Sequence, residues 1–279
     1  MKKHVLTIAV FIAAVMFLTI DFADAQWRSD THDVYNAPTG VDVTIDGKLD
    51  EWVDVMNSVT GTDGEPFCGI PFENIGTFQE YGGGTWSGAD DHTTCFMIAW
   101  NADAVYLALE ITDDEHEHAA GQAWNGDGAQ IAIEPSGDRT ANLPLFLYNA
   151  GLRDNGDLLL QNERTNNLPG LTAGEDFAVT RDDGANKTYY EFRVTTDKVG
   201  LTGSFTAGIE FGLGICVNDG DLGAGQNGQK GWSGWYPHAV VFGKNSEKTG
   251  LVILSDTAVT PVEPNGKLTT TWGNVKSSR

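Results

Sequence analysis

The sequence has few basic residues and a large excess of acidic ones. Its 279 residues include 17 lysines and arginines against 39 aspartates and glutamates, and the net charge at pH 7 is −22. Nucleic acids and anionic lipids are polyanions, so a chain this acidic is not expected to bind either of them. A neutral ligand or a divalent cation suits the charge, and so does plain solubility in an extracellular medium.

Cysteine is also scarce, with Cys68, Cys95 and Cys216 the only three. The spacing of cysteine and histidine is too wide to predict a zinc site. An exported protein can keep a disulfide, and a Cys68–Cys95 bond would join a long loop to a strand. Cys216 lies in an apolar strand and is predicted to be a buried thiol.

Long hydrophobic runs are missing after the first 25 residues, so no later segment is expected to span a bilayer. The chain starts with Lys2 and Lys3, continues with an apolar run at 5–20, and has small residues at Ala23 and Ala25. This pattern predicts a secretory signal peptide at 1–25, with a retained membrane anchor as the alternative. We therefore expect a secreted, extracellular or periplasmic protein that is not held in the membrane after cleavage.

Motifs of the common catalytic sites are absent as well. The sequence has no G-x-S-x-G, no H-E-x-x-H and no glycine-rich phosphate loop. Paired carboxylates could act as acid and base, but among so many acidic residues a pair carries little information. The sequence favours a non-catalytic protein.

What the sequence does have is short strands of alternating polarity. The clearest is 105–111, where apolar residues occupy every second position. The other predicted strands are 41–46, 94–100, 130–133, 143–149, 158–161, 177–180, 188–194, 208–217, 240–242 and 250–254. With 34 glycines and almost no helical periodicity, this pattern predicts an all-β, antiparallel β-sandwich.

Smaller features complete this organisation. The turn Asp182–Gly184 predicts a hairpin, and short helices are expected at 48–52 and 195–200. The sandwich is assigned to 41–256, after an N-terminal lead at 26–40. Residues 257–279 are assigned to a linker and a tail peptide around Trp272, which either docks as a strand or serves for cell-surface or partner attachment.

Tryptophans in glycine-rich loops are the best candidates for ligand binding. Trp124, Trp232 and Trp235 lie outside any periodic pattern, with Asp127 and Gln130 close to the first. The flat C–H faces of sugars stack on aromatic rings while nearby polar side chains bond the hydroxyls. The alternative is that each ring simply packs over the base of its loop.

Two acidic loops could hold a metal ion. Their candidate ligands are Asp113, Asp114, Asp219 and Asp221. Oxygen ligands of this kind suit Ca²⁺. His116 and His118 in the first loop could instead bind a transition metal, and the further alternative is a solvated charged loop.

Five segments, in order, resemble the family 9 carbohydrate-binding modules, a group related to DOMON-type sandwiches. Ile45–Trp52 is similar to the opening I-D-G-x-x-D-x-x-W pattern, and Trp100–Asp113 resembles the strand pair that follows it. Trp124–Pro135 resembles W-x-x-D-(S/G)-x-E-(I/L)-x-(I/V)-D-P. Tyr190–Leu201 and Ile209–Asp219 resemble two later segments, the second being I-G-F-x-x-x-V-N-D.

The resemblance implies an immunoglobulin-like, jelly-roll-like sandwich, structural Ca²⁺, and a sugar held between two tryptophans. Trp124 matches the first of these. Trp235 is expected to be the second, because Phe242-Gly243 follows it as F-G follows the family tryptophan, and Trp232 is the reserve. The implied function is binding of a mono-, oligo- or polysaccharide, in association with polysaccharide binding or degradation.

The polar positions depart from the family pattern. Gln130, Leu147 and Cys216 stand where sugar-binding members carry Glu, Arg and Gln. The change removes charge-assisted hydrogen bonds to hydroxyls, so the preferred sugar is left open. Two alternatives stay open beside sugar binding: a surface protein that keeps the fold for structure or adhesion, and a haem-binding sandwich using an axial ligand such as Met97.

Overall fold

Strands dominate the chain, as the alternation predicts. The computed structural model describes residues 28, 32–58, 67–68, 79–80, 85–222 and 229–259. The strands of this part are β1 (Val34–Thr39), β2 (Gln79–Glu80), β3 (His92–Trp100), β4 (Ala104–Asp113), β5 (Gly128–Glu134), β6 (Phe146–Leu152), β7 (Leu158–Arg164), β8 (Phe177–Asp182), β9 (Lys187–Thr195), β10 (Glu210–Gly220), β11 (Gln229–Ser233) and β12 (Gly250–Ala258). The predicted signal peptide at 1–25 and the predicted tail peptide around Trp272 lie outside the described residues.

Helical structure is brief. In the described part of the chain it consists of α2 (Val53–Ser58) and four 3₁₀ turns, η1 (Asp50–Trp52), η2 (Thr196–Lys198), η3 (Pro237–Ala239) and η4 (Ser246–Lys248). None of the helices in the described ranges is long and apolar enough to cross a membrane.

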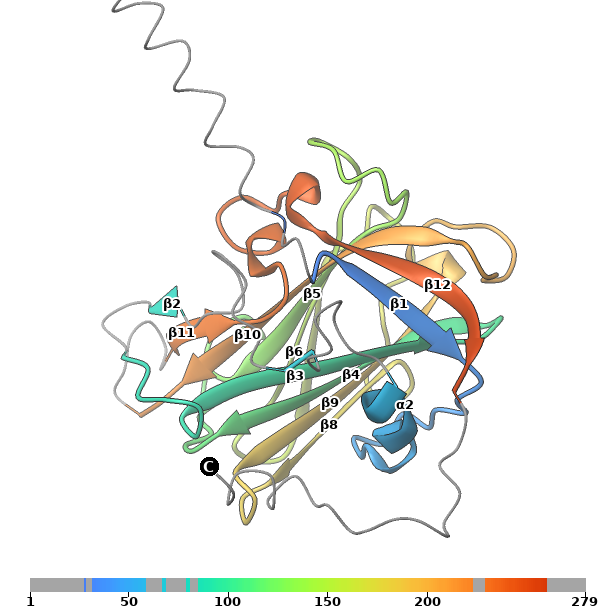
Figure 1. Ribbon diagram of the computed structural model, residues 1–279. Helices are drawn as coiled ribbons and strands as arrows, with labels where there is room; N and C mark the ends of the chain where they lie inside the picture. Colours follow the sequence, from blue (N-terminus) through green and yellow to red (C-terminus); the bar gives the residue numbers. More distant parts are fainter. Residues whose placement is uncertain are drawn as a thin grey trace, which may run out of the picture.

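The strands form one hydrogen-bonded sheet that folds over on itself. Its order is β7-β6-β5-β10-β12-β1-β3-β4-β9-β8, with β11 added beside β10 and β2 beside β11. Figure 1 shows β3, β4, β9 and β8 side by side in front of β10, β5 and β6. The two ends of the path meet, because β8 contacts both β6 and β7. Two layers therefore enclose one core.

Side chains at every second position point into this core. Phe96 and Ile98 of β3 and Leu107 and Leu109 of β4 are buried against Ile131 and its neighbours from the other layer. Burying an aliphatic or aromatic side chain of this size contributes about 1.5–3 kcal/mol each. The alternation that predicts the strands is thus the alternation that builds the core.

The sheet differs from the prediction at its N-terminal strand. β1 pairs in parallel with β12 and, at Thr39, with β3, so the sheet is not purely antiparallel. β1 precedes residue 41, where the sandwich was predicted to start, and the predicted strand 41–46 is not a strand. The predicted strand 240–242 is also wrong, since these residues follow η3 in a turn. Both errors have the same cause: a short apolar run is buried in a loop as readily as in a strand.

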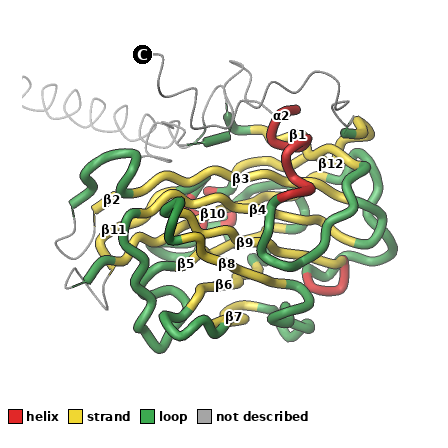
Figure 2. The backbone as a smooth tube through the Cα atoms, turned by 90° about the horizontal axis from the view of Figure 1, so that it is seen from below, coloured by secondary structure: helices red, strands yellow, loops and turns green. Residues whose placement is uncertain are grey.

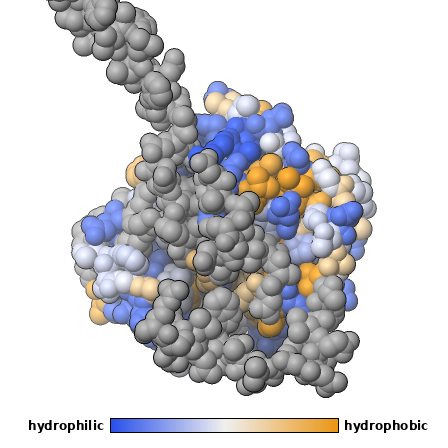
Figure 3. Space-filling model, in the orientation of Figure 1, coloured by the Kyte–Doolittle hydropathy of each residue, from blue (hydrophilic) through white to orange (hydrophobic). Residues whose placement is uncertain are grey.

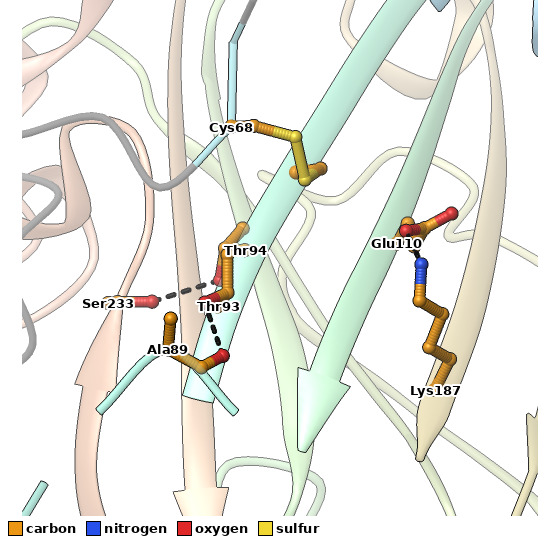
Figure 4. The surroundings of a disulfide bond; sticks show 8 residues. Cys68, Ala89, Thr93, Thr94, Glu110, Lys187 and Ser233 are labelled. Carbon is orange, nitrogen blue, oxygen red and sulfur yellow. Dashed lines mark hydrogen bonds and ion pairs between the residues drawn. A yellow bond between two sulfur atoms is a disulfide. The ribbon is translucent and has the colours of Figure 1, made fainter. Parts of the chain in front are cut away.

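The cysteines behave as predicted. Cys68 and Cys95 form a disulfide, and Cys216 is buried. Figure 4 shows Cys68 tied to β3, with Thr94 further along the strand pointing toward Ser233 of β11. The Thr94 and Ser233 hydroxyls lie 2.9 Å apart, which ties β11 to β3.

The outer face of β3 and β4 is covered by the segment before α2. Trp52 and Val55 are buried there against Met97 and Tyr106, and Figure 2 shows α2 lying outside the strands. Trp52 Nε1 donates to Glu191 Oε1 at 2.9 Å. Met97, considered as an axial haem ligand, is part of this packed cluster.

The covering segment requires glycine at position 47, both for its backbone conformation and for the space around it. The φ of Gly47 is +78°, and an added Cβ would lie 2.6 Å from Thr180 Cγ2. The Gly47 amide donates to Glu191 Oε2 at 2.7 Å. The I-D-G-x-x-D-x-x-W segment therefore acts as a cover that Glu191 holds at both ends.

Candidate functional site

A groove lies on the outer face of the other layer. Its volume is about 460 Å³. The side chains that line it are Trp124, Gln130, Gln161, Glu163, Trp232, Val241, Phe242 and Lys244. They come from the loop before β5, from β5, β7 and β11, and from the turn after η3, so five separate parts of the chain converge on it.

The strand register places the polar residues of the groove on one face. Cys216 pairs with Gln130, Gln130 with Asn149, and Asn149 with Gln161, across β10, β5, β6 and β7. Their neighbours Ile131, Tyr148 and Ile215 point the other way, into the core. Because side chains alternate along a strand, the core packing determines which residues face outward.

Trp124 sits at the groove as predicted. It is half-buried, and its carbonyl accepts a hydrogen bond from Asn218 Nδ2 at 2.9 Å. Two residues on, Gly126 has φ +75°, and an added Cβ would lie 2.7 Å from His118 Nδ1 and 2.8 Å from the Glu117 carbonyl. The Trp124 loop is therefore fitted closely against the 117–118 segment.

The second ring in the groove is Trp232, which the sequence offered as the alternative to Trp235. It pairs with Asn218 on the outer face of β11, while its neighbour Ser233 points inward to β3. Trp232 is 4% exposed, and its ring meets Phe242 edge-on at 5.5 Å.

Phe242 stands out at the rim of the groove. It is 71% exposed and has φ +55°, a conformation that is uncommon for a bulky residue. Large exposed hydrophobic side chains are few in the described ranges: Val34, Val53, Trp86, Leu158, Leu222 and Phe242. Figure 3 shows another part of the surface, where apolar residues over β1 and β12 are bordered by hydrophilic ones.

Trp235 does not line the groove, contrary to the prediction. It is 0% exposed and packs in the core 5.3 Å from the Phe96 ring. Its Nε1 donates to the His32 carbonyl at 2.8 Å. Gly234, with φ +137° and in close approach to Ile215, turns the chain inward between the two tryptophans. The spacing to Phe242-Gly243 could not reveal this turn.

The two polar candidates have different roles. Gln130 lines the groove, and its Nε2 donates to Asn218 Oδ1 at 3.2 Å. Asp127 is buried away from the groove; its Oδ1 accepts from the Gly220 amide at 2.8 Å and its Oδ2 from the Glu117 amide. Asp127 therefore orients the Trp124 loop instead of facing a ligand.

Leu147 and Cys216 do not line the groove. Both are fully buried in an outer apolar cluster that also contains Trp232 and Val240. Burial raises the pKa of the Cys216 thiol to about 12, so it stays protonated. Neither residue can replace the polar contacts that the family pattern has at these positions.

Beside the groove, the two predicted acidic loops meet in one buried cluster. Three groups of residues there could each hold an ion, because the ligand atoms within each group lie within 4.8 Å of one another. The groups are Asp91, Asp219 and Asp221; Asp113, Asp114 and Asp221; and Asp113, His116 and Asp127. All four predicted metal ligands are in these groups. Asp91 was missed because it precedes β3, far from the acidic loops in sequence.

Few positive charges balance this cluster. Arg181 Nη1 lies 3.5 Å from Asp113 Oδ2, and Lys230 forms an ion pair with Asp221. Burial, and then the charge of Asp219, raise the pKa of Asp113 to about 7. Burial, and then Asp113, raise the pKa of Asp127 in the same direction.

The donor set fits a divalent cation. Asp219 is 0% exposed, and within the described part of the chain neither of its carboxylate oxygens accepts a hydrogen bond, although His92 Nδ1 lies 3.2 Å from Oδ1. Buried carboxylates without partners are costly, and a bound cation would compensate them. Because the donors are mostly carboxylate oxygens, they suit Ca²⁺ better than a transition metal. His118 belongs to none of the three groups, and burial lowers its pKa to about 4.

Comparisons with known proteins agree on one family. The model of the carbohydrate family 9 binding domain-like family matches residues 72–257. No curated protein matches the chain.

Solved structures give the same fold. One is a family 9 carbohydrate-binding module from Caldicellulosiruptor kristjanssonii in complex with cellotriose, 16% identical, with a TM-score of 0.50; the match covers 82% of this chain and 99% of that one. Such a module from the same organism in complex with glucose is 15% identical, with a TM-score of 0.50 and coverage of 82% and 100%.

The family match extends over more than half of the chain, and four of the five motifs read from the sequence, from Trp100 to Asp219, lie within the same region. The chain therefore belongs to the carbohydrate family 9 binding domain-like family.

Proposed function

We propose that this protein is a non-catalytic module that binds a mono- or oligosaccharide in the groove, with Trp124 and Trp232 as the stacking rings. The observation that carries the proposal is the groove itself, in which two tryptophans and several polar side chains converge. The structures with the same fold are complexes with cellotriose and glucose, which supports a sugar as the ligand.

The chemistry of the groove suits such a ligand. The apolar C–H faces of a sugar ring stack on aromatic rings, while amide and carboxylate groups bond its hydroxyls. Phe242 offers a third, exposed ring at the rim. The net charge of −22 disfavours anionic ligands. Binding is expected to be weak, because a shallow site leaves little free energy after the costs of association.

Calcium belongs to the same proposal as a structural ion. Asp221, which is shared by two of the groups, would hold it together with Asp91 and Asp219 or with Asp113 and Asp114. Bound there, the ion would neutralise the buried carboxylates and join the end of β10 to the start of β3 or the end of β4.

A chelator should then lower the melting temperature of the protein. A ligand at 100 times its Kd stabilises the folded state by about 2.7 kcal/mol, and removing it loses that amount. Differential scanning calorimetry with EDTA, followed by addition of excess Ca²⁺ or Mg²⁺, measures the effect. Recovery with Ca²⁺ alone is expected, and a melt that EDTA leaves unchanged would remove the ion from the proposal.

The wider setting is also proposed. The Cys68–Cys95 disulfide suits an oxidising compartment, which supports export by the segment at 1–25. A role in polysaccharide binding or degradation, with the tail at 257–279 as a point of attachment, follows from this setting.

The test of sugar binding is calorimetric titration with neutral and acidic sugars in the presence of Ca²⁺. Trp124→Ala should abolish binding, since it removes a stacking face, and should leave the melting temperature nearly unchanged because the ring is only half-buried. The matched substitution Trp86→Ala removes a tryptophan that is 41% exposed and does not line the groove, and it should keep binding. If the wild type bound none of the sugars tested, a structural or adhesive surface protein would be favoured instead.

A further inference from the structure

The polar side chains available to a ligand lie mainly on one side of the groove. On the side of β5, β6 and β10, Leu147 and Cys216 are fully buried and apolar in character, and the amide nitrogen of Gln130 donates to Asn218. On the β7 side, Gln161 and Glu163 both line the groove. Recognition of hydroxyls therefore depends on β7 and what surrounds it.

Glu163 is the centre of a short polar chain. Asn149 Nδ2 donates to Glu163 Oε2 at 2.6 Å, and Lys244 Nζ lies 3.2 Å from Glu163 Oε1. The Glu163 and Lys244 side chains are 29% and 28% exposed, so both are fixed by their partners yet within reach of a ligand. Each carboxylate oxygen keeps further capacity to accept, because it offers two lone pairs.

Two buried hydrogen-bond acceptors lie on the strands next to and including that of Glu163, and both lack a donor among the described residues. Asn149 Oδ1 and Gln161 Oε1 accept no hydrogen bond within the described part of the chain. Asn149 is 0% exposed, and the strand register places it on the same outer face as Gln130 and Gln161. A buried acceptor left unpaired is unfavourable, so a hydroxyl donor from a ligand would be stabilising at Gln161, which lines the groove. Asn149 does not line the groove and acts by holding Glu163.

The balance of donors and acceptors indicates the class of ligand. The open groups are amide and carboxylate oxygens, which accept from hydroxyls. Among the described residues that line the groove, Lys244 is the one cation, and it is already neutralised by Glu163. A carboxylated sugar would bring a second negative charge toward Glu163, whereas a neutral sugar supplies only hydroxyl donors.

We propose that Gln161 and Glu163, with Lys244 as the counter-ion of Glu163 and Asn149 as the residue that positions it, determine specificity and select a neutral sugar over the corresponding uronic acid. The proposal rests on the sugar-binding function above and names its ligand class. Polar recognition in this chain has thus moved from the β5, β6 and β10 positions of the family pattern to β7.

The test is titration of the full chain in Ca²⁺ with glucose, xylose, galactose and cellotriose, and with glucuronate and galacturonate. The wild type should bind at least one neutral sugar and bind its uronate more weakly. Glu163→Gln should raise the Kd for the neutral sugar about tenfold, because a charged acceptor is lost. It should also shift the preference toward the uronate, because Lys244 is no longer neutralised.

Further variants separate the roles. Gln161→Leu should raise the Kd for the neutral sugar without shifting the preference for charge. Glu175→Gln is the matched control, since it removes one carboxylate from an exposed loop position that does not line the groove. It should leave both Kd values unchanged, and melting curves confirm that all variants are folded.

The outcomes are distinct. A wild type that prefers the uronate, or a neutral sugar whose binding is lost in Trp124→Ala but unaffected by Glu163→Gln and Gln161→Leu, overturns this inference and leaves the proposed function standing. A wild type that binds no sugar on the panel overturns the proposed function, and the inference with it.

Discussion

The two layers of the sandwich treat their outer faces differently. On β3 and β4, the Ile45–Trp52 segment and α2 cover the sheet, and Trp52 is buried beneath them. On β5, β6 and β10, the short η3 turn packs on part of the sheet through Ala239, and Trp124 and Trp232 line an open groove. The same residue type thus serves packing on one face and faces a groove on the other.

What differs is the surrounding backbone and charge. Trp52 Nε1 is bonded by Glu191, which also accepts from the amides of Asp46 and Gly47, so the cover is tied down at several points. In the groove, Glu163 is held by Asn149 and Lys244 at the edge of the open space. Glu191 thus holds the cover on one face, whereas Glu163 keeps the capacity to accept hydrogen bonds beside the groove on the other.

The largest effect is expected on the covered face. Trp52→Ala removes a fully buried indole and its bond to Glu191, and should lower the free energy of unfolding by about 3–5 kcal/mol. Val53→Ala, at a position that is 47% exposed, is the control and should change it by less than about 0.5 kcal/mol. Urea unfolding measures both. Equal effects of the two substitutions would mean that the cover does not contribute to stability.

A smaller effect is expected at the base of the groove. Gly126→Ala forces a side chain into a left-handed conformation and against His118, and should destabilise the protein by about 1–3 kcal/mol. It should also weaken sugar binding, because the Trp124 loop must shift. Gly156→Ala has a similar φ of +84° but meets no atom within 4 Å, so it isolates the backbone strain. If both variants bind sugar equally well, the close fit of Gly126 does not position Trp124.

The smallest effect is a pH dependence on the covered face. Burial raises the pKa of Glu191 above its usual value, partly offset by the hydrogen bonds it accepts. Its contribution to stability is therefore fully present below the unfolded pKa of about 4.3 and is lost as the pH rises through the folded pKa. Urea unfolding of the wild type and Glu191→Gln across this range should show the wild type losing stability relative to the variant. A constant difference between them would contradict the raised pKa.

Local patterns predicted much of this molecule. The predicted strand at 105–111 lies within β4, and the turn at Asp182–Gly184 joins β8 to β9 as a hairpin. Trp52 is buried, as predicted for the helical turn at 48–52. The Cys68–Cys95 bond was predicted from the expectation of export and the small number of cysteines. These features depend on residues that are close in sequence or on a very small set of candidates.

The site was harder to predict for a physical reason. Trp232 and Trp235 are three residues apart in one glycine-rich stretch of sequence, and the close approach of Gly234 to Ile215 decides which of them enters the core. Asp91, Asp127 and Asp219 gather because three strand ends meet, a fact that no local spacing contains. β1 lies in parallel with β12, more than two hundred residues away, for the same reason.

The sequence by itself determined the class of fold, the family and the first tryptophan of the groove, because strand periodicity and ordered motifs are local properties of the chain. Only the tertiary structure decided the second tryptophan, the single acidic cluster and the polar side of the groove. Those depend on how distant segments approach one another, and the packing of the common core sets that approach.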